Sequence, residues 1–193
     1  AVEAVSELVK VGCKEFFVAN AKEGKALRSK FDEIILYVLE GALESTYDNL
    51  LEYDLRPVLN TLAQCKLWSR QSAPCAIHVD SGMERLGLNE EEMNQMLCDL
   101  EQLNPQLLIS HLARADEPDH RFNQLQIERF DLISQRVSDR YPEVETSLTN
   151  SAGVAHQDYV DAGADIIKSN TFGANRIKLE SYGVADQLEH INR

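Results

Sequence analysis

Short apolar runs alternate with segments of helical periodicity along the whole chain. Seven runs are brief and mostly apolar rather than alternating, as expected for strands that are covered on both faces. They are EFFVAN (15–20), IILYVL (34–39), RPVLN (56–60), CAIHVD (75–80), LLISH (107–111), VETSLTN (144–150) and ADIIKSN (164–170). The pattern therefore predicts seven strands separated by helices.

Three of the intervening segments have a clear apolar stripe at helical spacing. The chain opens directly on one, AVEAVSELVKVG (1–12). The segment 90–103 places on one face Met93, Met96, Leu97, Leu100 and Leu103. The segment 123–137 is expected to do the same with Leu125, Ile127, Phe130, Ile133 and Val137.

Repeated strand–helix units favour parallel pairing with right-handed crossovers. No long Gly/Pro/Ser linker divides the chain, so one domain is the simplest partition. Two parallel architectures compete, an open doubly wound sheet and a closed eight-stranded barrel. The leading helix suggests that the eighth strand would precede Ala1. We therefore expect an α/β fold, a (β/α)8 TIM-barrel-like parallel sheet that lacks its first strand.

Composition and charge restrict the classes of partner that the protein can bind. The chain has 193 residues, 44% of them hydrophobic and 26% charged, which is ordinary for a globular protein. A formal net charge of −13 argues against nucleic acid or an anionic membrane surface as a partner. No apolar run has the length of a membrane span, and no signal peptide is visible. A cytoplasmic protein is expected.

The four cysteines, at 13, 65, 75 and 98, are scattered and form no C-x-x-C pair. A zinc or redox site is therefore unsupported, and no metal is expected. Buried, reduced thiols are the more ordinary interpretation.

The most specific stretch is HVDSGMERLG (78–87), in which a strand ends at Asp80 and a tight polar turn leads to Arg85. In parallel α/β proteins the carboxyl ends of the strands line the active face. An arginine there suits a phosphate, a carboxylate or a phenolate oxygen, although Arg85 taken alone could equally be an ordinary surface residue.

Two further strand ends carry polar residues. His111 ends one strand, where a histidine can act as a base, stack on an aromatic cofactor or simply pack. TSLTNSAGV (146–154) brings Asn150 and Ser151 to another end, where open backbone amides can receive a phosphate or form a plain turn.

Together these segments resemble alanine racemase, over about residues 1–160. The similar stretches include FFVANAKEGKALR (16–28), RPVLNT (56–61), HVDSGMERLGL (78–88), ISHLARADEPDH (109–120), QLQIERF (124–130) and LTNSAGVAHQDYV (148–160). The resemblance implies a barrel that holds pyridoxal phosphate. It also implies that Arg85 contacts the phenolic oxygen of the cofactor, that His111 stacks on the pyridine ring, and that Asn150 and Ser151 lie by the cofactor, with Ser151 on its phosphate.

Two catalytic groups of that family have no counterpart in these residues. The Schiff-base lysine belongs to a V-K-A-N-A-Y-G-like first strand. FVANAKEGK (17–25) is similar but has Val18 before ANA, and Lys22 is expected on a helix surface. The opposite base is a tyrosine on a C-terminal β domain. Without them, covalent attachment of the cofactor is not expected in this chain, and no catalytic residue can be assigned.

The tail departs from that family's pattern. Where the family has an R-P-G-I-like turn whose arginine contacts the pyridine nitrogen, this chain has Asp161-Ala162-Gly163-Ala164, which places Gly163 and Ala164 by the cofactor. The segment 161–193, with SNTFGANRIKL, is similar instead to the homocysteine-binding barrel of methionine synthase and homocysteine S-methyltransferase, without their zinc-binding cysteine motifs. The expected partition is therefore a racemase-like segment, 1–160, and a methionine-synthase-like βα segment, 161–193, that completes the same barrel.

Three hypotheses follow. The first is an alanine-racemase-like pyridoxal phosphate barrel acting on a small amino acid, incomplete as it stands. The second is a homocysteine S-methyltransferase fragment, and the third is a chimeric or truncated barrel without catalysis. The missing first strand would leave two unpaired strand edges, which either join each other, associate with a partner chain, as in a homodimer, or lower the solubility.

Overall fold

The computed structural model describes residues 2–117 and 119–148. The described strands are β1 (Glu15–Val18), β2 (Ile35–Val38), β3 (Arg56–Leu59), β4 (Pro74–His78), β5 (Asn104–Ile109) and β6 (Glu145–Ser147). The described helices are α1 (Val2–Lys10), α2 (Ala21–Arg28), α3 (Tyr47–Glu52), α4 (Leu62–Trp68), α5 (Glu90–Asp99) and α6 (Arg121–Arg140).

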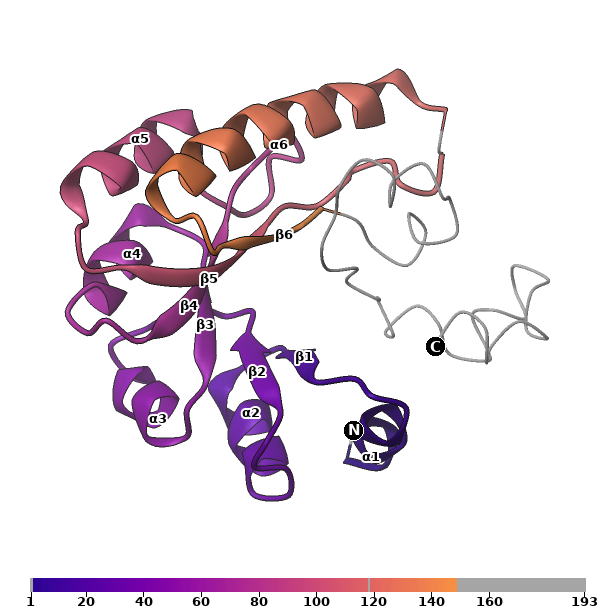
Figure 1. Cartoon of the computed structure of the whole chain (residues 1–193), viewed down its shortest axis with the longest axis vertical. Coiled ribbons are helices and arrows are strands. Elements are labelled where there is room, and N and C mark those ends of the chain that lie inside the picture. The colour runs from indigo at the N-terminus through magenta and orange to yellow at the C-terminus, as the bar shows by residue number, and fades with distance from the viewer. Residues whose placement is uncertain (1, 118, 149–193) are drawn as a thin grey trace.

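The six strands form one parallel sheet whose spatial order follows the chain, β1-β2-β3-β4-β5-β6. A doubly wound sheet would reverse its strand order at a switch point, and this one does not. Helices α2 to α6 form an arc around one side of the curled sheet (Figure 1). The structure thus confirms the barrel-type architecture and the first six strands; the seventh, 164–170, lies outside the described residues.

Three side-chain caps set where helices begin after their strands. Asn20, Thr61 and Asn89 accept from the backbone N–H three residues ahead, at Glu23, Gln64 and Glu92. Asn89 and Glu92 complete a reciprocal capping box. Each cap satisfies a backbone N–H in the first turn of its helix and so fixes where α2, α4 and α5 begin.

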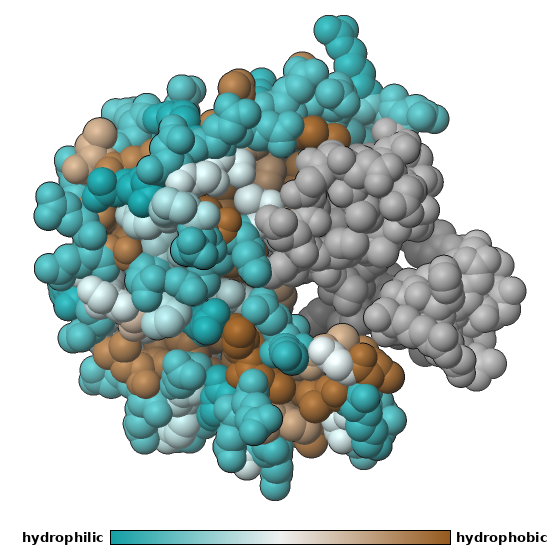
Figure 2. All heavy atoms as spheres, viewed as in Figure 1, coloured by the Kyte–Doolittle hydropathy of each residue, from teal (hydrophilic) through white to brown (hydrophobic). Residues whose placement is uncertain are grey.

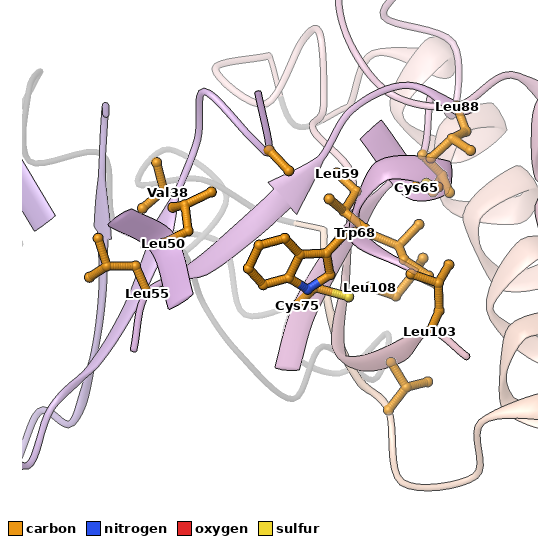
Figure 3. Packing of buried hydrophobic residues seen from close by; sticks show 14 of the residues in the cluster. Val38, Leu50, Leu55, Leu59, Cys65, Trp68, Cys75, Leu88, Leu103 and Leu108 are labelled. Carbon is orange, nitrogen blue, oxygen red and sulfur yellow. The ribbon is translucent and has the colours of Figure 1, made fainter. Parts of the chain in front are cut away.

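The outer face of the sheet packs against the helices and forms the larger core. Its centre is Trp68, which is 1% exposed and donates its indole N–H to the Ala73 carbonyl at 3.1 Å. Tyr47 meets the indole edge-on at 5.5 Å between ring centroids. Around the indole lie strand and helix side chains, of which Figure 3 labels Val38, Leu50, Leu55, Leu59, Cys65, Cys75, Leu88, Leu103 and Leu108.

The inner face carries a second, smaller apolar layer. It consists of Tyr37, Val58, Ala76, Leu107 and Ile109, with Phe17, Ile35 and Leu39 partly buried beside it. Side chains alternate between the two faces along each strand, so the register assigns every strand residue to the helix side or to the barrel interior. Figure 2 shows hydrophobic surface over the part of the molecule that holds β1, β2 and α1, where Phe17 and Ile35 are only half-buried.

The predicted apolar stripes hold for one helix and fail in part for another. Met93 and Met96 on α5 are fully buried, as predicted. On α6 the prediction that Leu125 faces the core is wrong, because it is 37% exposed, whereas Gln126 is fully buried. The Gln126 side chain has hydrogen-bond partners at the sheet edge, so α6 turns this glutamine towards the sheet and Leu125 towards solvent.

The prediction of buried, reduced thiols is confirmed for Cys65 and Cys75, which are free and fully buried. Burial raises the pKa of Cys65 to about 12, so this thiol stays protonated. Cys98 is exposed, contrary to the prediction, because it lies on the solvent face of α5. Lys22 is exposed on α2, as predicted.

No helix within the part of the chain that the structure describes is long and apolar enough to cross a membrane. The same residues contain no group of three or more His, Cys, Asp or Glu side chains placed to hold a metal ion.

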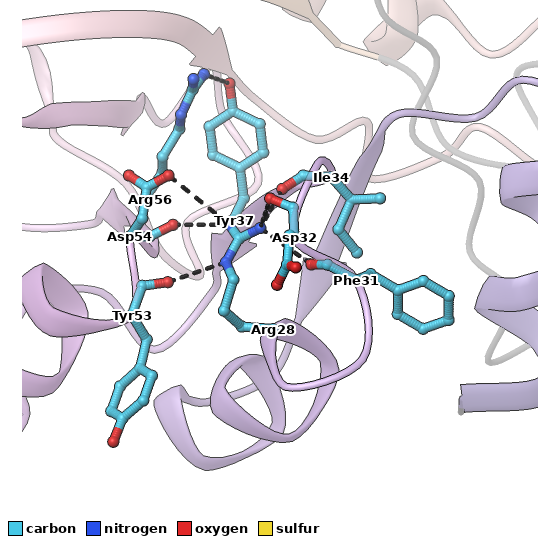
Figure 4. A network of polar contacts seen from close by, with 8 residues as sticks. All are labelled: Arg28, Phe31, Asp32, Ile34, Tyr37, Tyr53, Asp54 and Arg56. Carbon is cyan, nitrogen blue, oxygen red and sulfur yellow. Dashed lines mark hydrogen bonds and ion pairs between the residues drawn. The ribbon is translucent and has the colours of Figure 1, made fainter.

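The loops at the amino ends of β2 and β3 are held by one arginine (Figure 4). Arg28, at the end of α2, donates to five backbone carbonyls between 2.7 and 3.2 Å: those of Phe31, Asp32, Ile34, Tyr53 and Asp54. Its side chain is 13% exposed. A guanidinium has five N–H donors in a planar fork, so it can serve two loops at once.

A polar cluster lies on the inner face near the same end of the strands. Arg56 donates to the Tyr37 hydroxyl at 3.3 Å, and burial, opposed by this hydrogen bond, raises the pKa of Tyr37 to about 12. Glu15 on β1 has a buried carboxylate oxygen without a hydrogen-bond partner. Its pKa is raised, first by burial and then by the negative charge of Glu145 on β6, while Arg56 lowers it. The two outermost described strands therefore interact electrostatically across the interior.

We expect Arg28→Lys to lower the free energy of unfolding by about 2–4 kcal/mol, because an ammonium cannot reach five carbonyls and leaves some of them unsatisfied. Urea denaturation monitored by Trp68 fluorescence measures this. Arg70→Lys is the matched control, since Arg70 is 61% exposed and only pairs with Glu44, and its change should stay below about 0.5 kcal/mol. Equal losses in both variants would contradict the role assigned to Arg28.

Glu15→Gln should stabilise the fold near neutral pH. A carboxyl with a raised pKa in the folded state holds its proton more tightly when folded, so its ionisation destabilises the fold as the pH rises through that pKa. The gain should be present at about pH 7.5 and should fade towards about pH 4, below the ordinary value of 4.5. Urea midpoints at both pH values test this, with exposed Glu143→Gln as the control. Destabilisation by Glu15→Gln at neutral pH would refute the argument.

Candidate functional site

Polar side chains gather on the inner face at the carboxyl ends of β3 to β6. The register that pairs Val58 with Ala76 continues to Asn60 and His78, and His78 in turn pairs with Ile109. Ile109 pairs with Ser147. His111 lies two residues past Ile109 and, by alternation, on the same face. Asn60, His78, His111 and Ser147 are here called the inner strand-end set.

Asn60 and His78 form a buried pair within this set. They are 6% and 8% exposed, and the Asn60 Oδ1 lies 2.8 Å from the His78 Nδ1. The Asn60 backbone N–H donates to Gln64 Oε1 at 2.8 Å, which fixes the loop after β3. An amide and an imidazole buried beside an apolar layer are unusual in a core that otherwise excludes polar groups.

Ser147 supplies an unsatisfied group. Its side chain is 1% exposed, and its Oγ has no hydrogen-bond partner among the described residues. Buried hydroxyls normally have a partner, and an exception points to an absent group such as a ligand. The end of β6 therefore contains a hydroxyl suited to a polar ligand, beside the end of β5.

Arg85 lies on a loop that closes on its own strand. The Leu88 N–H donates to the His78 carbonyl at 2.8 Å, and the Asp80 N–H donates to the Leu88 carbonyl at 3.0 Å. Gly87, at φ +112°, permits this approach, because a Cβ there would lie 2.7 Å from the Val79 carbonyl carbon. Arg85 is exposed on the segment between these two anchors.

The start of that loop is braced by a carboxylate. Asp80 accepts from the backbone N–H of Gly82 at 2.8 Å and of Glu84 at 3.1 Å. Because the Asp80 carboxylate accepts from the backbone of its own loop, it stabilises the turn that leads to the exposed Arg85.

The position of His111 is set from outside the sheet by a fully buried glutamine. Gln126 Nε2 donates to the His111 carbonyl at 3.0 Å and to Ser81 Oγ at 3.1 Å, and its Oε1 accepts from the Ala113 N–H at 2.8 Å. Ser81 in turn bonds to Ser110 at 2.8 Å between hydroxyl oxygens. Gln126 thus ties the loops after β4 and β5 together.

The structure places Arg85 and His111, both predicted, after the adjacent strands β4 and β5 at the same edge of the sheet. His111 is half-buried. The other predicted cofactor-binding residues lie outside the described residues: Asn150, Ser151, Gly163 and Ala164.

Sequence reasoning missed four residues: Asn60, His78, Ser147 and Gln126. Three of them stand inside the predicted strands, so a polar residue in an otherwise apolar strand was the available indication. Gln126 stands four residues before Phe130, on the predicted apolar side of its helix.

The fold defines a class of protein: a parallel βα barrel, with the candidate site at the carboxyl ends of its strands. Residues 1–167 match the family model "Alanine racemase, N-terminal domain". The chain belongs to this family.

Curated relatives support the same assignment. Alanine racemase of Rickettsia bellii is 34% identical over an alignment that covers 91% of this chain and 46% of the relative. Alanine racemase of Rickettsia rickettsii is 35% identical, with 94% of this chain and 54% of the relative covered. The chain therefore spans about half the length of the curated relatives it matches.

Solved structures show the same fold. An alanine racemase from Bartonella henselae, described with covalently bound pyridoxal phosphate, superposes with a TM-score of 0.75 at 24% identity, over 85% of this chain and 47% of that one. The Clostridium difficile alanine racemase gives 0.76 at 20% identity, over 87% and 46%.

The comparisons give no support to a methionine-synthase-like tail. The family model continues past residue 160 to residue 167, and an alignment covering 94% of the chain cannot stop at residue 160. The physical reason for the mistaken interpretation is local: SNTFGANRIKL has 11 residues, less than one strand–helix unit, and so short a likeness between two barrel families does not carry ancestry or function with it.

We predict that Gln126→Leu will destabilise the protein by about 2–4 kcal/mol, because it removes the hydrogen bonds that the Gln126 amide makes to the His111 carbonyl, the Ala113 N–H and the Ser81 hydroxyl, the last of which keeps only Ser110. Hydrogen exchange should quicken at the Ala113 amide in particular. Gln124→Leu on the exposed face of the same helix, where the glutamine donates to Glu128, is the control and should change little. Unchanged exchange at the Ala113 amide would contradict the proposal that Gln126 ties the loops after β4 and β5 together.

Proposed function

We propose that this chain is the cofactor-binding barrel portion of a pyridoxal-phosphate-dependent alanine racemase, acting on a small amino acid. The observation that carries the proposal is the inner strand-end set, with the unsatisfied Ser147 hydroxyl and with Arg85 on the loop after β4, in a chain of the alanine racemase family. When bound, pyridoxal phosphate supplies an electron sink that stabilises negative charge on the substrate Cα.

The residues have distinct parts in this proposal. Arg85, an exposed cation on an anchored loop, donates to the phenolic oxygen of the cofactor. His111, half-buried with its carbonyl fixed by Gln126, stacks on the pyridine ring. Ser147 donates its hydroxyl to a polar atom of the bound group. Asn150 and Ser151, with Gly163 and Ala164, are proposed to lie by the cofactor, the Ser151 group on its phosphate.

The described residues supply no lysine to the inner strand-end set, and Lys22 is exposed on α2. We therefore propose that residues 1–193 bind the cofactor without a covalent bond to a unique lysine. Moving a proton at the substrate Cα would need groups from outside these residues. A homodimer is likewise part of the proposal.

Homocysteine chemistry is not part of the proposal. The described residues show no cluster of thiols or other side chains placed to bind zinc, and the comparisons favour alanine racemase over most of the chain. Zinc content and alkylation of homocysteine by the purified protein are expected to be nil.

The test is binding of pyridoxal phosphate by the whole chain, measured by equilibrium dialysis with absorbance detection. Arg85→Ala should weaken binding about tenfold or more, and His111→Ala about three- to tenfold, which correspond to a charge-assisted hydrogen bond and one ring contact. Arg70→Ala, which removes an exposed arginine between α4 and the amino end of β4, should have no effect.

Borohydride treatment followed by peptide mapping should reveal no uniquely modified lysine. A chain that fails to bind the cofactor, or whose binding ignores both substitutions, would refute the proposed function. Racemisation by the 193-residue chain with pyridoxal phosphate alone would refute the view that its proton-moving groups lie elsewhere.

A further inference from the structure

A residue with a left-handed backbone that is not glycine stands directly before Arg85. Glu84 has φ +55°, and in the part of the chain that the structure describes the only other such residue is Asp54, at φ +47°. Residues with a Cβ rarely adopt this conformation, and glutamate is not among those that favour it. A backbone outlier beside a candidate binding residue points to a role for the strained conformation.

The Asp80 carboxylate holds Glu84 in this conformation. The Glu84 N–H donates to Asp80 Oδ1 and Oδ2, each at 3.1 Å, and Oδ1 also accepts from the Gly82 N–H at 2.8 Å. Hydrogen bonds to an ionised carboxylate are stronger than those between neutral groups. The turn from residue 80 to residue 84 therefore closes on its own first side chain, and the direction in which the backbone leaves Glu84 is fixed.

Helix α6 packs against the same turn. Gly82, at φ +130°, lies so close to this helix that a Cβ there would be 2.7 Å from Arg129 Nη1 and 3.4 Å from Phe122 Cζ. Arg129 also donates to the Ser81 carbonyl, although at 3.5 Å this hydrogen bond is long. The turn is therefore held by a carboxylate within it and by a helix beside it, and any displacement of the turn would break contacts with one of them.

Arg85 is the first residue beyond this turn. It is exposed, and no hydrogen bond or ion pair to another residue of the described chain holds its guanidinium. Leu86, the next residue, is 52% exposed, and the loop returns to β4 only at Leu88. The backbone on either side of Arg85 is therefore what determines where its side chain points.

We propose that Glu84 is a positioning residue whose left-handed backbone, held by Asp80, directs Arg85 towards the bound cofactor. A right-handed or extended backbone at residue 84 would send the chain in another direction and move the guanidinium away from the ligand. The role belongs to the backbone, so the Glu84 carboxylate is dispensable. The inference rests on the proposed function for the identity of the ligand, whereas the contacts that hold the turn do not depend on it.

Substitutions at residue 84 separate the backbone from the side chain, because each of them removes the carboxylate. Glycine and asparagine tolerate the left-handed conformation, and valine, which is branched at Cβ, does not. Glu84→Gly and Glu84→Asn should keep the affinity of the whole chain for pyridoxal phosphate within about twofold of the parent, whereas Glu84→Val should weaken it about fivefold or more. Equal affinities in all three variants, whether retained or lost, would overturn the proposal.

A double-mutant cycle shows whether residue 84 acts through Arg85. In an Arg85→Ala chain the group to be directed is absent, so adding Glu84→Val should change the affinity for pyridoxal phosphate by less than about twofold. A further loss as large as that in the parent background would assign the effect to general damage of the site and would overturn the positioning role. If Glu84→Val does not fold, Asp80→Ala, which frees the Glu84 N–H, replaces it in the same cycle with the same expected outcome.

Asp54→Val is the matched control. It places the same side chain at the other left-handed position, in the loop that precedes β3, at the end of the strands opposite the candidate site. The urea midpoint should fall because of the backbone strain, but the affinity for pyridoxal phosphate should stay within about twofold of the parent. A loss of affinity equal to that in Glu84→Val would show that strain anywhere in the barrel weakens binding, and would overturn the proposal.

The held turn can also be measured without cofactor, so the two proposals fail separately. Hydrogen exchange at the Glu84 amide should be slow in the parent chain and should quicken in Asp80→Ala, because both Asp80 oxygens accept from this N–H. Fast exchange at Glu84 in a parent chain that binds pyridoxal phosphate preserves the proposed function and overturns this inference. Slow exchange in a parent chain that does not bind pyridoxal phosphate refutes the proposed function and supports the held turn alone.

Discussion

The parallel register that runs from β1 to β6 decides what every strand residue can do. Because side chains alternate across a sheet, one set of positions faces the helices and the other faces the interior of the curl. Val58 beside Ala76 on the inner face makes Asn60 a neighbour of His78 two residues later. A slip of one residue in a single strand would exchange the two faces and would bury the strand-end polar groups among leucines.

The two faces solve the problem of buried polar groups in different ways. Behind the sheet, Gln126 satisfies Ser81, the His111 carbonyl and the Ala113 N–H within a closed network, which makes the loops after β4 and β5 one unit. In front of it, Asn60 fixes one side of His78, and Ser147 has an unsatisfied hydroxyl. Closed networks provide rigidity, and an unsatisfied hydroxyl such as that of Ser147 can receive a polar group, so this contrast favours the inner face for the proposed cofactor site.

The sequence predicted the parallel barrel, the six described strands and the strand-end positions of Arg85 and His111, because strands buried on both faces are continuous apolar runs and polar residues follow them directly. It did not reveal the Asn60–His78 pair, since the two are 18 positions apart and only the register brings them together. Leu125 was misassigned for a related reason: the partners of Gln126 are up to 45 positions away, and periodicity within a helix contains no information about them.

The loop that carries Arg85 is fastened at both ends to the strand from which it leaves, through Leu88 to the His78 carbonyl and the Asp80 N–H. Length changes between these two fastenings need not move β4. The loop that carries Arg85 can therefore be lengthened or shortened during evolution, or its arginine replaced, while His78 on β4 keeps its place. The loop can therefore vary in length while β4 keeps its position, and this would let one barrel adapt to ligands of different size.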